Sequence, residues 1–440
     1  MKFYDREEEL KELKRVQKQA FEDHSRMTVL TGRRRIGKTS LGQLAMEGTT
    51  SVYLFVARKD DALLCQDFTE QIRLSLGDIP TGFKSFKDIF KMLMIFGQTK
   101  KFNLFIDEFQ EFWHINKSIF SDIQNLWDQY RRQTNVNLIL SGSVYTMMEK
   151  IFKDSKEPLF GRADLEIRLK PFRTDVMKQI MSDAKPEYTN DDLLALYTIT
   201  GGVPKYIELF INNGCTDLDS MVDFMTRPDS QFIDEGRNLL IQEFGKNYAT
   251  YFSILSLIAN GELTQKDIQS KMEEGKNIGG QLRILEEDYL LITKKRPIKA
   301  KEGSQTVKFE LKDNFLRFWF RYFEKYRSLI EIGNFKMLGT LIRNDFNVFS
   351  GFALERWFRE KMMESQQYIN IGGWWMSDAE NPNEIDIVTI DMEENVQAYE
   401  VKRQSKKYNP NLLQQKVELM RNKIFKGKEI GFGNLSLEDM

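Results

Sequence analysis

The chain has 440 residues, more than one hydrophobic core usually serves, so we expect two to four domains. Apolar residues make up 41% and charged residues 29%, which excludes a disordered or fibrous protein and fits a globular one. The formal net charge of −1 excludes a uniformly basic coat for nucleic acid, so any such binding must come from local patches.

Several further classes are excluded by what the chain lacks. The richest apolar stretch, Phe315 to Phe323, contains two arginines, so we expect no membrane span. The acidic N-terminus does not fit a secretory signal. The two cysteines, Cys65 and Cys215, are too far apart for a zinc motif, which favours a reducing cytoplasm. Two histidines, His24 and His114, leave little room for histidine-based metal or triad chemistry.

The first 170 residues alternate short apolar runs with helical patterns. This alternation is typical of a parallel β-sheet covered by helices, an α/β fold. The predicted strands are Met27 to Leu30, Ser51 to Ala57, Phe102 to Ile106, Asn137 to Leu140 and Leu165 to Leu169.

A glycine-rich loop follows the first predicted strand. Its sequence, GRRRIGKT, fits the P-loop pattern G-x-x-x-x-G-K-[ST] and lies between an apolar run and a helical one. Backbone N–H groups of such a loop wrap a phosphate, Lys38 would reach the β- and γ-phosphates, and Thr39 would ligate Mg²⁺. The alternative is a Gly-rich turn, which the flanking strand and helix disfavour. The predicted nucleotide-binding residues are Gly32, Arg33, Arg34, Arg35, Ile36, Gly37, Lys38, Thr39 and Ser40.

The third predicted strand ends in two acids, in the sequence FNLFIDEF. Asp107 would hold Mg²⁺ through water, and Glu108 would polarise the attacking water, the role that separates hydrolysis from binding. An apolar run before two acids is also compatible with a strand and a solvated turn, but its place after a P-loop favours the catalytic interpretation.

Two further polar positions are weaker signals. Ser141 and Ser143 end the next strand, where either could sense the γ-phosphate, although a serine-rich turn is as compatible with the pattern. Arg162 follows a glycine in PLFGR and could stabilise transition-state charge in its own subunit or in a neighbour's site. A plain surface arginine is the alternative.

The motifs GRRRIGKTS, FIDEFQEF, LILSGS, PLFGR and TGGVPKY resemble, in this order, those of the archaeal-type ATPase family, a branch of AAA+/STAND-like P-loop proteins. The opening FYDREEEL resembles the family's N-terminal signature near the nucleotide base. The resemblance covers about residues 1 to 240 and implies ATP as the nucleotide. It also implies that Gly202 and Pro204 belong to a lid that closes over ATP.

The segment after the lid resembles a winged helix, with three helical runs and then a basic hairpin. Such a hairpin can touch phosphates and the third helix can enter a major groove, whereas protein contact is the alternative. The third run carries Glu286, Glu287 and Asp288, which repel DNA. The basic residues of the hairpin are Lys294, Lys295, Arg296, Lys299, Lys301 and Lys308, against the single acid Glu302.

Near the C-terminus, NEIDIVTI and VQAYEVKR predict two strands that present Asp386, Glu400 and Lys402. Residues two apart in a strand share a face, so Glu400 and Lys402 lie side by side. Asp386 and Glu400 would bind Mg²⁺ with Glu355 of a preceding helix, and Lys402 would act on the phosphate or the attacking water. Gln414 or Gln415 on the following helix could also face this site.

This set resembles the PD-(D/E)XK nuclease superfamily, and in particular the nuclease-like domain of unknown function that follows archaeal-type ATPase domains. A basic tail adds to the resemblance. The alternative is a nuclease-like fold retained for binding alone. The basic residues of the tail are Arg403, Lys406, Lys407, Lys416, Arg421, Lys423, Lys426 and Lys428.

We therefore predict four domains: a P-loop ATPase core (1–170), a helical lid (171–244), a winged helix (245–330) and a small α/β nuclease-like domain (331–440). The predicted function is Mg²⁺-dependent ATP hydrolysis that controls a DNA-binding, DNA-cleaving C-terminal module, in a cytoplasmic protein with no membrane contact and a possible homo-oligomeric state. The alternatives are a nucleotide-switched regulator or scaffold without nuclease activity, and a structural nucleotide-binding protein that hydrolyses nothing.

Overall fold

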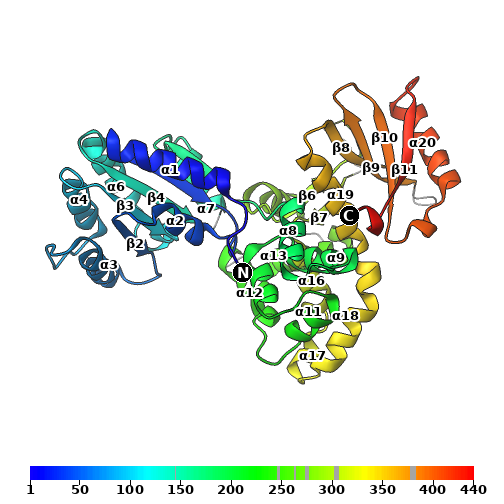
Figure 1. The fold of residues 1–440 in the computed structure, drawn as a ribbon, viewed down its shortest axis with the longest axis horizontal. Coiled ribbons are helices and arrows are strands. Elements are labelled where there is room, and N and C mark those ends of the chain that lie inside the picture. Colours follow the sequence, from blue (N-terminus) through cyan, green and yellow to red (C-terminus); the bar gives the residue numbers. More distant parts are fainter. Residues whose placement is uncertain (144, 245–247, 262–263, 273–276, 302–306, 377–382) are drawn as a thin grey trace. The chain divides into compact units, whose positions relative to one another are not determined.

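The computed structural model describes residues 1–143, 145–244, 248–261, 264–272, 277–301, 307–376 and 383–440. The chain divides into two compact units, which Figure 1 shows in ribbon form. One unit is Tyr4–Lys170, and the other joins Met1–Phe3 to Pro171–Met440. Each unit is described by itself below.

The unit Tyr4–Lys170 is built on a five-stranded sheet in the order β2-β3-β4-β1-β5, and every neighbouring pair is parallel. All five predicted strands are present, which confirms the α/β fold of P-loop NTPases. Their bounds are β1 (Arg26–Thr31), β2 (Ser51–Phe55), β3 (Phe102–Asp107), β4 (Val136–Gly142) and β5 (Leu165–Arg168).

Helices cover both faces of this sheet, because successive side chains of each strand point to opposite faces. Leu30 and Phe105 pack on one face with α1 and α2, whereas Leu104 and Leu138 pack on the other with α3, α4 and α6. The helices of this unit are α1 (Glu7–Glu22), α2 (Lys38–Met46), α3 (Asp61–Leu76), α4 (Phe86–Phe96), α5 (Phe112–Ile115), α6 (Ser118–Tyr130) and α7 (Tyr145–Lys153), with the short turns η1 (Phe109–Glu111) and η2 (Arg131–Gln133).

The strand order determines where the chemistry lies. β1 lies between β4 and β5 and is separated from β2 by β3 and β4. The loop after β1 and the ends of β3 and β4 therefore meet at the carboxyl edge of the sheet. Ligands of open parallel sheets bind at this edge, where the strand order reverses. All residues of β3 and β4 are buried, which makes these two strands a rigid base for the side chains that follow them.

The second unit begins with helices. α9 is buried along most of its length and begins at a capping box formed by Thr189 and Asp192. The helices up to the first hairpin are α8 (Thr174–Ala184), α9 (Asn190–Thr200), α10 (Pro204–Asn212), α11 (Leu218–Met225), α12 (Phe232–Phe244), α13 (Tyr248–Ala259), α14 (Gln265–Ser270) and α15 (Gly279–Arg283), which continues as the π-helical turn η4 (Ile284–Asp288).

The strands β6 (Ile292–Lys295) and β7 (Lys308–Leu311) form an antiparallel hairpin directly after η4. The order of helices and hairpin matches the prediction for residues 245–330, although the third helix is short. The helices that follow the hairpin are α16 (Asn314–Trp319), continued by η5 (Phe320–Glu324), then α17 (Arg327–Glu331), α18 (Phe335–Phe349) and α19 (Gly351–Glu364).

A four-stranded sheet in the order β11-β10-β9-β8 completes the second unit. β10 pairs in parallel with β11 and antiparallel with β9, and α20 connects β10 to β11. Leu413, Val417 and Met420 of α20 pack on the sheet. The elements are β8 (Tyr368–Trp375), β9 (Glu384–Asp391), β10 (Val396–Lys402), η6 (Ser405–Lys407), α20 (Pro410–Ile424), β11 (Ile430–Ser436) and η7 (Leu437–Asp439).

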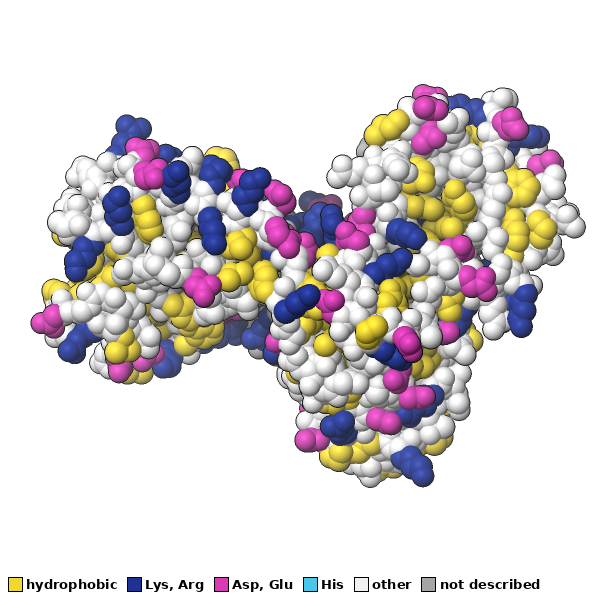
Figure 2. All heavy atoms as spheres, viewed as in Figure 1, with side chains coloured by type: hydrophobic (Ala, Val, Ile, Leu, Met, Phe, Trp, Pro, Cys, Tyr) yellow, Lys and Arg dark blue, Asp and Glu magenta, His cyan; other side chains and the backbone are white. Residues whose placement is uncertain are grey.

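Positive and negative side chains are interspersed over the face shown in Figure 2, as the near-zero net charge predicts. Within the part of the chain that the structure describes, no helix is long and apolar enough to cross a membrane.

An ion pair on α19 ties the hairpin to the helices of the second unit. The guanidinium of Arg356 donates to the carbonyl oxygens of Leu311 (2.5 Å) and Lys312 (2.8 Å) and lies 3.4 Å from the carboxylate of Glu310. Burial alone would raise the pKa of Glu310, but the charges of Arg356 and Lys295 hold it at about 2. Both side chains of the pair are nearly buried, at 12% and 14% exposed, so each depends on the other for its solvation.

We expect Arg356→Met to lower the free energy of unfolding by about 2 kcal/mol, because it removes one of the two cations beside the nearly buried carboxylate of Glu310 and leaves only Lys295. The matched control is Arg283→Met, which removes an i,i+4 pair with Glu287 in which the arginine is 75% exposed, so the free energy of unfolding should change little. Because the pKa of Glu310 is depressed, its contribution is present above pH 4.5 and is lost as the pH falls towards 2. The measurement is the free energy of unfolding by denaturant at pH 7 and at pH 3. An equal loss in Arg356→Met and Arg283→Met at pH 7 would contradict the account.

Candidate functional site

The loop after β1 has the backbone of a phosphate-binding loop. Gly32 has a φ of +150°, and a Cβ there would lie 2.9 Å from the carbonyl oxygen of Leu169. Gly37 has a φ of +93° and is the N-cap residue, directly before the first residue of α2. Glycine is therefore required at both ends of the loop, once for close backbone approach and once for the left-handed turn into the helix.

Lys38, the first residue of α2, folds back over this loop. Its Nζ donates to the carbonyl oxygens of Gly32 (2.9 Å) and Arg33 (3.1 Å), and the residue is 6% exposed. The ammonium is thus held at the loop whose backbone N–H groups would wrap a phosphate.

The predicted Mg²⁺ residues lie together at the end of β3. Thr39 Oγ1 donates to Asp107 Oδ2 over 2.6 Å, and the backbone N–H of Glu108 donates to Asp107 Oδ1 over 3.0 Å. Tyr53 on the neighbouring strand β2 also donates to Asp107 Oδ2, over 3.0 Å. The sequence motifs did not indicate Tyr53, because it lies in an ordinary strand pattern.

Glu108 follows Asp107 in a left-handed conformation, with a φ of +53°. Its Oε2 accepts hydrogen bonds from Ser143 Oγ (2.7 Å) and from Gln110 Nε2 (2.5 Å). Ser143 is thus brought to the catalytic edge, as predicted, whereas Ser141 is buried in β4 and its Oγ has no hydrogen bond among the described residues. Gln110 is a site residue that the motifs did not reveal.

Arg162 lies at the opposite edge of the sheet. It precedes β5, where the N–H of Asp164 bonds to the carbonyl oxygen of Met27 at the start of β1. Its guanidinium donates to Asp128 near the end of α6 (2.7 Å) and to the carbonyl oxygen of Pro158 (2.7 Å). Of the two predicted roles, action in its own subunit does not fit this position, because the P-loop lies at the carboxyl edge. Action in a neighbour's site stays a prediction.

The N-terminal signature lies at the same edge as the P-loop. Arg6, 5% exposed, donates to the carbonyl oxygen of Lys170 just beyond β5 (2.5 Å) and to Glu9 (3.3 Å). The backbone N–H of Leu169 bonds to the carbonyl oxygen of Thr31 at the start of the P-loop. Pro204 lies in the second unit, at the first turn of α10, and its contact with a nucleotide stays a prediction.

The predicted residues of the C-terminal site lie on neighbouring elements. Asp386 of β9 accepts a hydrogen bond from the N–H of Val401 on β10 (2.7 Å). Burial, and then the negative charges of Glu355 and Glu400, raise the pKa of Asp386 to about 7. Lys402 Nζ lies 2.8 Å from Glu400 Oε1 on the same face of β10. α19, β9 and β10 therefore direct these four side chains to one region.

Cations hold two of the predicted metal ligands. Glu355 pairs with Arg359 (2.7 Å) and lies 3.7 Å from Lys295, and Glu400 contacts both Lys402 and Lys416. In the described ranges, no group of three or more His, Cys, Asp or Glu is arranged to hold a metal ion. The three predicted carboxylates are thus neighbours without forming a ready metal cage.

Lys416 is the side chain of α20 that reaches this region. It lies on the helix face of Leu413 and Val417, and its Nζ is 3.3 and 3.4 Å from the two carboxylate oxygens of Glu400. Gln414 and Gln415 are exposed, and the expectation that one of them faces the site stays a prediction. The helical period of the buried residues identifies Lys416, which the sequence placed only in a basic tail.

The basic hairpin contacts the C-terminal sheet, so part of its positive charge is engaged within the protein, and contact of its lysines with phosphates stays a prediction. Lys295 pairs with Glu310 (2.7 Å), Lys308 pairs with Glu384 (3.0 Å), and Lys299 lies over the ring of Phe425. Ile298 packs in the core of the sheet, and Pro297 forms a β-bridge with Gly373 of β8. The hairpin thus covers part of the open edge of β8. Lys295 and Lys308 are directed to acids, whereas Arg296, Lys299 and Lys301 are exposed. Glu302 lies outside the described residues.

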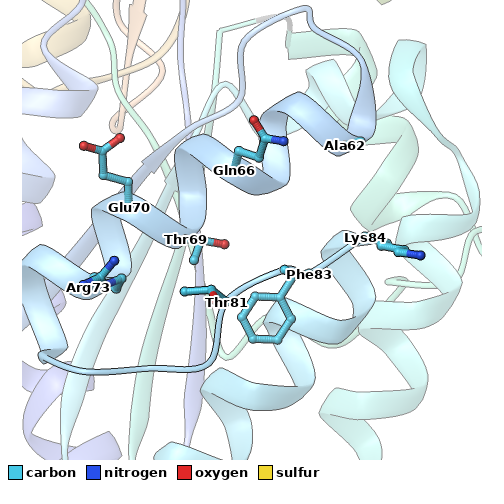
Figure 3. Close-up of a pocket in the computed structure, with 9 residues that line it drawn as sticks. Ala62, Gln66, Thr69, Glu70, Arg73, Thr81, Phe83 and Lys84 are labelled. Carbon is cyan, nitrogen blue, oxygen red and sulfur yellow. The ribbon is translucent and has the colours of Figure 1, made fainter.

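An open cavity of about 510 Å³ lies between α3 and the loop that precedes α4 (Figure 3). Gln66, Glu70 and Arg73 of α3 and Thr81 and Lys84 of the loop are among the residues that line it. No residue of the P-loop or of the β3 end is among them, so this cavity is distinct from the nucleotide site.

Comparison with known proteins agrees with this geometry. Residues 3–210 match the family described as an ATPase domain predominantly from Archaea, and residues 319–414 match a family of archaeal and bacterial proteins of unknown function. The uncharacterized protein MJECL04 of Methanocaldococcus jannaschii is 27% identical over 398 residues, which cover 88% of this chain and 84% of that protein.

Among solved structures, a Walker-type ATPase of Pyrococcus abyssi is similar in fold, with a TM-score of 0.53 and 18% sequence identity. The match covers 72% of this chain and 96% of that one. The P-loop, the acids at the end of β3 and the family matches lead to one conclusion: the chain carries an ATPase domain of the predominantly archaeal family of P-loop ATPases, joined to a C-terminal domain from a family of unknown function.

Proposed function

We propose that the protein is an AAA+/STAND-type hydrolase that binds ATP with Mg²⁺ at the P-loop, hydrolyses it, and thereby controls a C-terminal module that binds and cleaves DNA. The observation that carries the hydrolytic half is the meeting of Thr39, Asp107 and Glu108 at one edge of the sheet. Phosphate release from ATP tests this half, and DNA cleavage tests the other.

The residues of the P-loop edge fit the chemistry of ATP hydrolysis. Backbone N–H groups of the loop and Lys38 would bind the phosphates, and Ser143 would report on the γ-phosphate. Thr39 and Asp107 offer the oxygen atoms that Mg²⁺ prefers, and the ion would supply charge neutralisation. Glu108 is placed to orient the attacking water, because its carboxylate is held by the neutral donors Gln110 and Ser143 and remains an acceptor.

The proposed DNA-binding surface is the exposed part of the basic tail, together with the winged-helix-like segment. Three of the tail's cations are engaged elsewhere, since Arg403 pairs with Asp191, Lys428 with Glu394 and Lys416 with Glu400. Surface lysines and arginines bind phosphates without sequence preference. The exposed members of the tail are Lys406, Lys407, Arg421, Lys423 and Lys426.

The proposed cleavage site consists of Asp386, Glu400 and Glu355 as Mg²⁺ ligands, with Lys402 beside the phosphate. The support is their placement on β9, β10 and α19 and the raised pKa of Asp386, which is typical of carboxylates gathered at a functional site. Two buried free cysteines, Cys65 and Cys215, support the proposed cytoplasmic location.

We expect Glu400→Ala to lower Mg²⁺-dependent cleavage of linear and supercoiled DNA by about a hundredfold, as for loss of a group on which a metal site depends. The matched control is Glu393→Ala, in the exposed turn between β9 and β10, which should cleave like wild type. If wild type cuts neither substrate with ATP, ADP or no nucleotide, the cleavage proposal fails.

The second candidate is a nucleotide-switched regulator or scaffold that binds DNA or a protein without cutting. It is favoured by the cations that hold Glu355 and Glu400, and by the exposed acids Glu287 and Asp288 on η4. DNA binding without cleavage, unchanged in Glu400→Ala, would support it.

A further inference from the structure

The hydroxyl of Tyr53 is a polar group beside the ATPase site to which no motif assigns a role. Tyr53 lies on β2, opposite Phe105 of β3, and its OH donates to Asp107 Oδ2 over 3.0 Å. Thr39 Oγ1 donates to the same oxygen. One carboxylate oxygen therefore receives one donor from the P-loop helix and one from the neighbouring strand.

Packing against Phe105 fixes the position of the Tyr53 ring. Its ring meets that of Phe105 edge-on, with the centroids 5.4 Å apart. Phe105 in turn lies directly beneath α2, because Gly42 has no Cβ, and one built there would lie 2.8 Å from the ring. The helix α2, which carries Thr39, and the ring of Tyr53 thus both pack against the same buried phenylalanine.

The hydrogen bonds to Asp107 leave little freedom to its carboxylate. An ionised carboxylate has about four acceptor sites, and three are filled, by Thr39, Tyr53 and the N–H of Glu108. About one site remains for a further donor. Burial and the charge of Asp107 raise the pKa of Tyr53, so its phenol stays a donor at neutral pH.

We propose that Tyr53 is a positioning residue for Mg²⁺-dependent ATP binding: its hydroxyl orients the Asp107 carboxylate so that the remaining acceptor site can receive a Mg²⁺-bound water. The inference rests on the proposed Mg²⁺–ATP site and deepens it. Phenylalanine would pack on Phe105 equally well, so packing alone does not require the hydroxyl.

The test is Tyr53→Phe, which removes the hydroxyl and keeps the ring. We expect the Mg²⁺ concentration that half-saturates binding of a fluorescent ATP analogue to rise about five- to tenfold, the cost of one hydrogen bond to a charged group. Affinity for the analogue in EDTA and the melting temperature without nucleotide should stay at wild-type values. The matched control is Tyr130→Phe, which packs on the opposite face of the sheet and should titrate like wild type.

Each outcome decides between the inference and its alternatives. A wild-type Mg²⁺ requirement in Tyr53→Phe would overturn the inference, and so would an equal loss of affinity in EDTA, because that indicates a merely structural role. An absence of any Mg²⁺ effect on binding by wild type would overturn it too. If the shift appears but wild type releases no phosphate from ATP, the inference stands and the proposed hydrolysis fails.

Discussion

Glu108→Gln is expected to lower the rate of ATP hydrolysis by about a hundredfold to ten-thousandfold, the usual contribution of a group that handles the proton of the attacking water. An amide keeps the shape of the side chain and its hydrogen bonds to Gln110 and Ser143, but it cannot accept a proton. Because Glu108 does not belong to the loop that wraps the phosphates, ATP binding should be retained. Steady-state phosphate release and binding of a fluorescent ATP analogue measure the two effects separately.

The matched control is Glu111→Gln, which removes one negative charge three residues further along. Glu111 pairs with Arg58 rather than with a residue at the end of β3, so the variant should hydrolyse ATP at the wild-type rate. Equal rates of ATP hydrolysis by wild type and Glu108→Gln would mean that another residue orients the attacking water.

Arg162→Ala is expected to lower hydrolysis by about a thousandfold if this arginine completes a neighbour's site, as arginine fingers do. Arg162 precedes β5 at the edge of the sheet away from the P-loop, so it can serve only another subunit. Its ion pair with Asp128, whose side chain is 48% exposed, contributes little to the free energy of unfolding, so the variant should remain folded. Lys156→Ala, an exposed cation of the same segment, is the control.

Mixing the two inactive variants separates a role in a neighbour from a role in folding. Glu108→Gln still carries Arg162, and Arg162→Ala still carries Glu108, so mixed assemblies should regain part of the wild-type rate. If Arg162→Ala alone hydrolyses ATP at the wild-type rate and mixing changes nothing, Arg162 is a surface arginine without a role in hydrolysis.

The fold of the first unit was predictable because its signals are local. Fully buried parallel strands produce continuous apolar runs. Gly32 and Gly37 mark a loop that needs glycine, the first for close backbone approach and the second for its positive φ. Asp107 and Glu108 follow such a run directly. Their position at the catalytic edge requires no knowledge of distant contacts.

The residues that escaped prediction depend on tertiary contacts. Tyr53 reaches Asp107 from another strand, and Gln110 contacts Glu108 only because of the left-handed turn between them. Lys295 appeared to belong to a phosphate-binding hairpin, but it is directed to Glu310 and Glu355 because the hairpin covers β8.

Two strands of the C-terminal sheet also escaped prediction. β8 and β11 each contain two glycines, Gly372 and Gly373 in one and Gly431 and Gly433 in the other, which weaken the strand pattern. In α20 the helical phase, and not the residue type, decides that Lys416 rather than Gln414 or Gln415 faces Glu400.

The central claim is that the P-loop edge hydrolyses ATP with Mg²⁺. It is tested most directly by multiple-turnover phosphate release from ATP by the wild-type chain, in Mg²⁺ and in EDTA, across a range of protein concentrations. The account predicts release in Mg²⁺ that falls to background in EDTA and in Glu108→Gln. Release at the same background rate under all three conditions would contradict it.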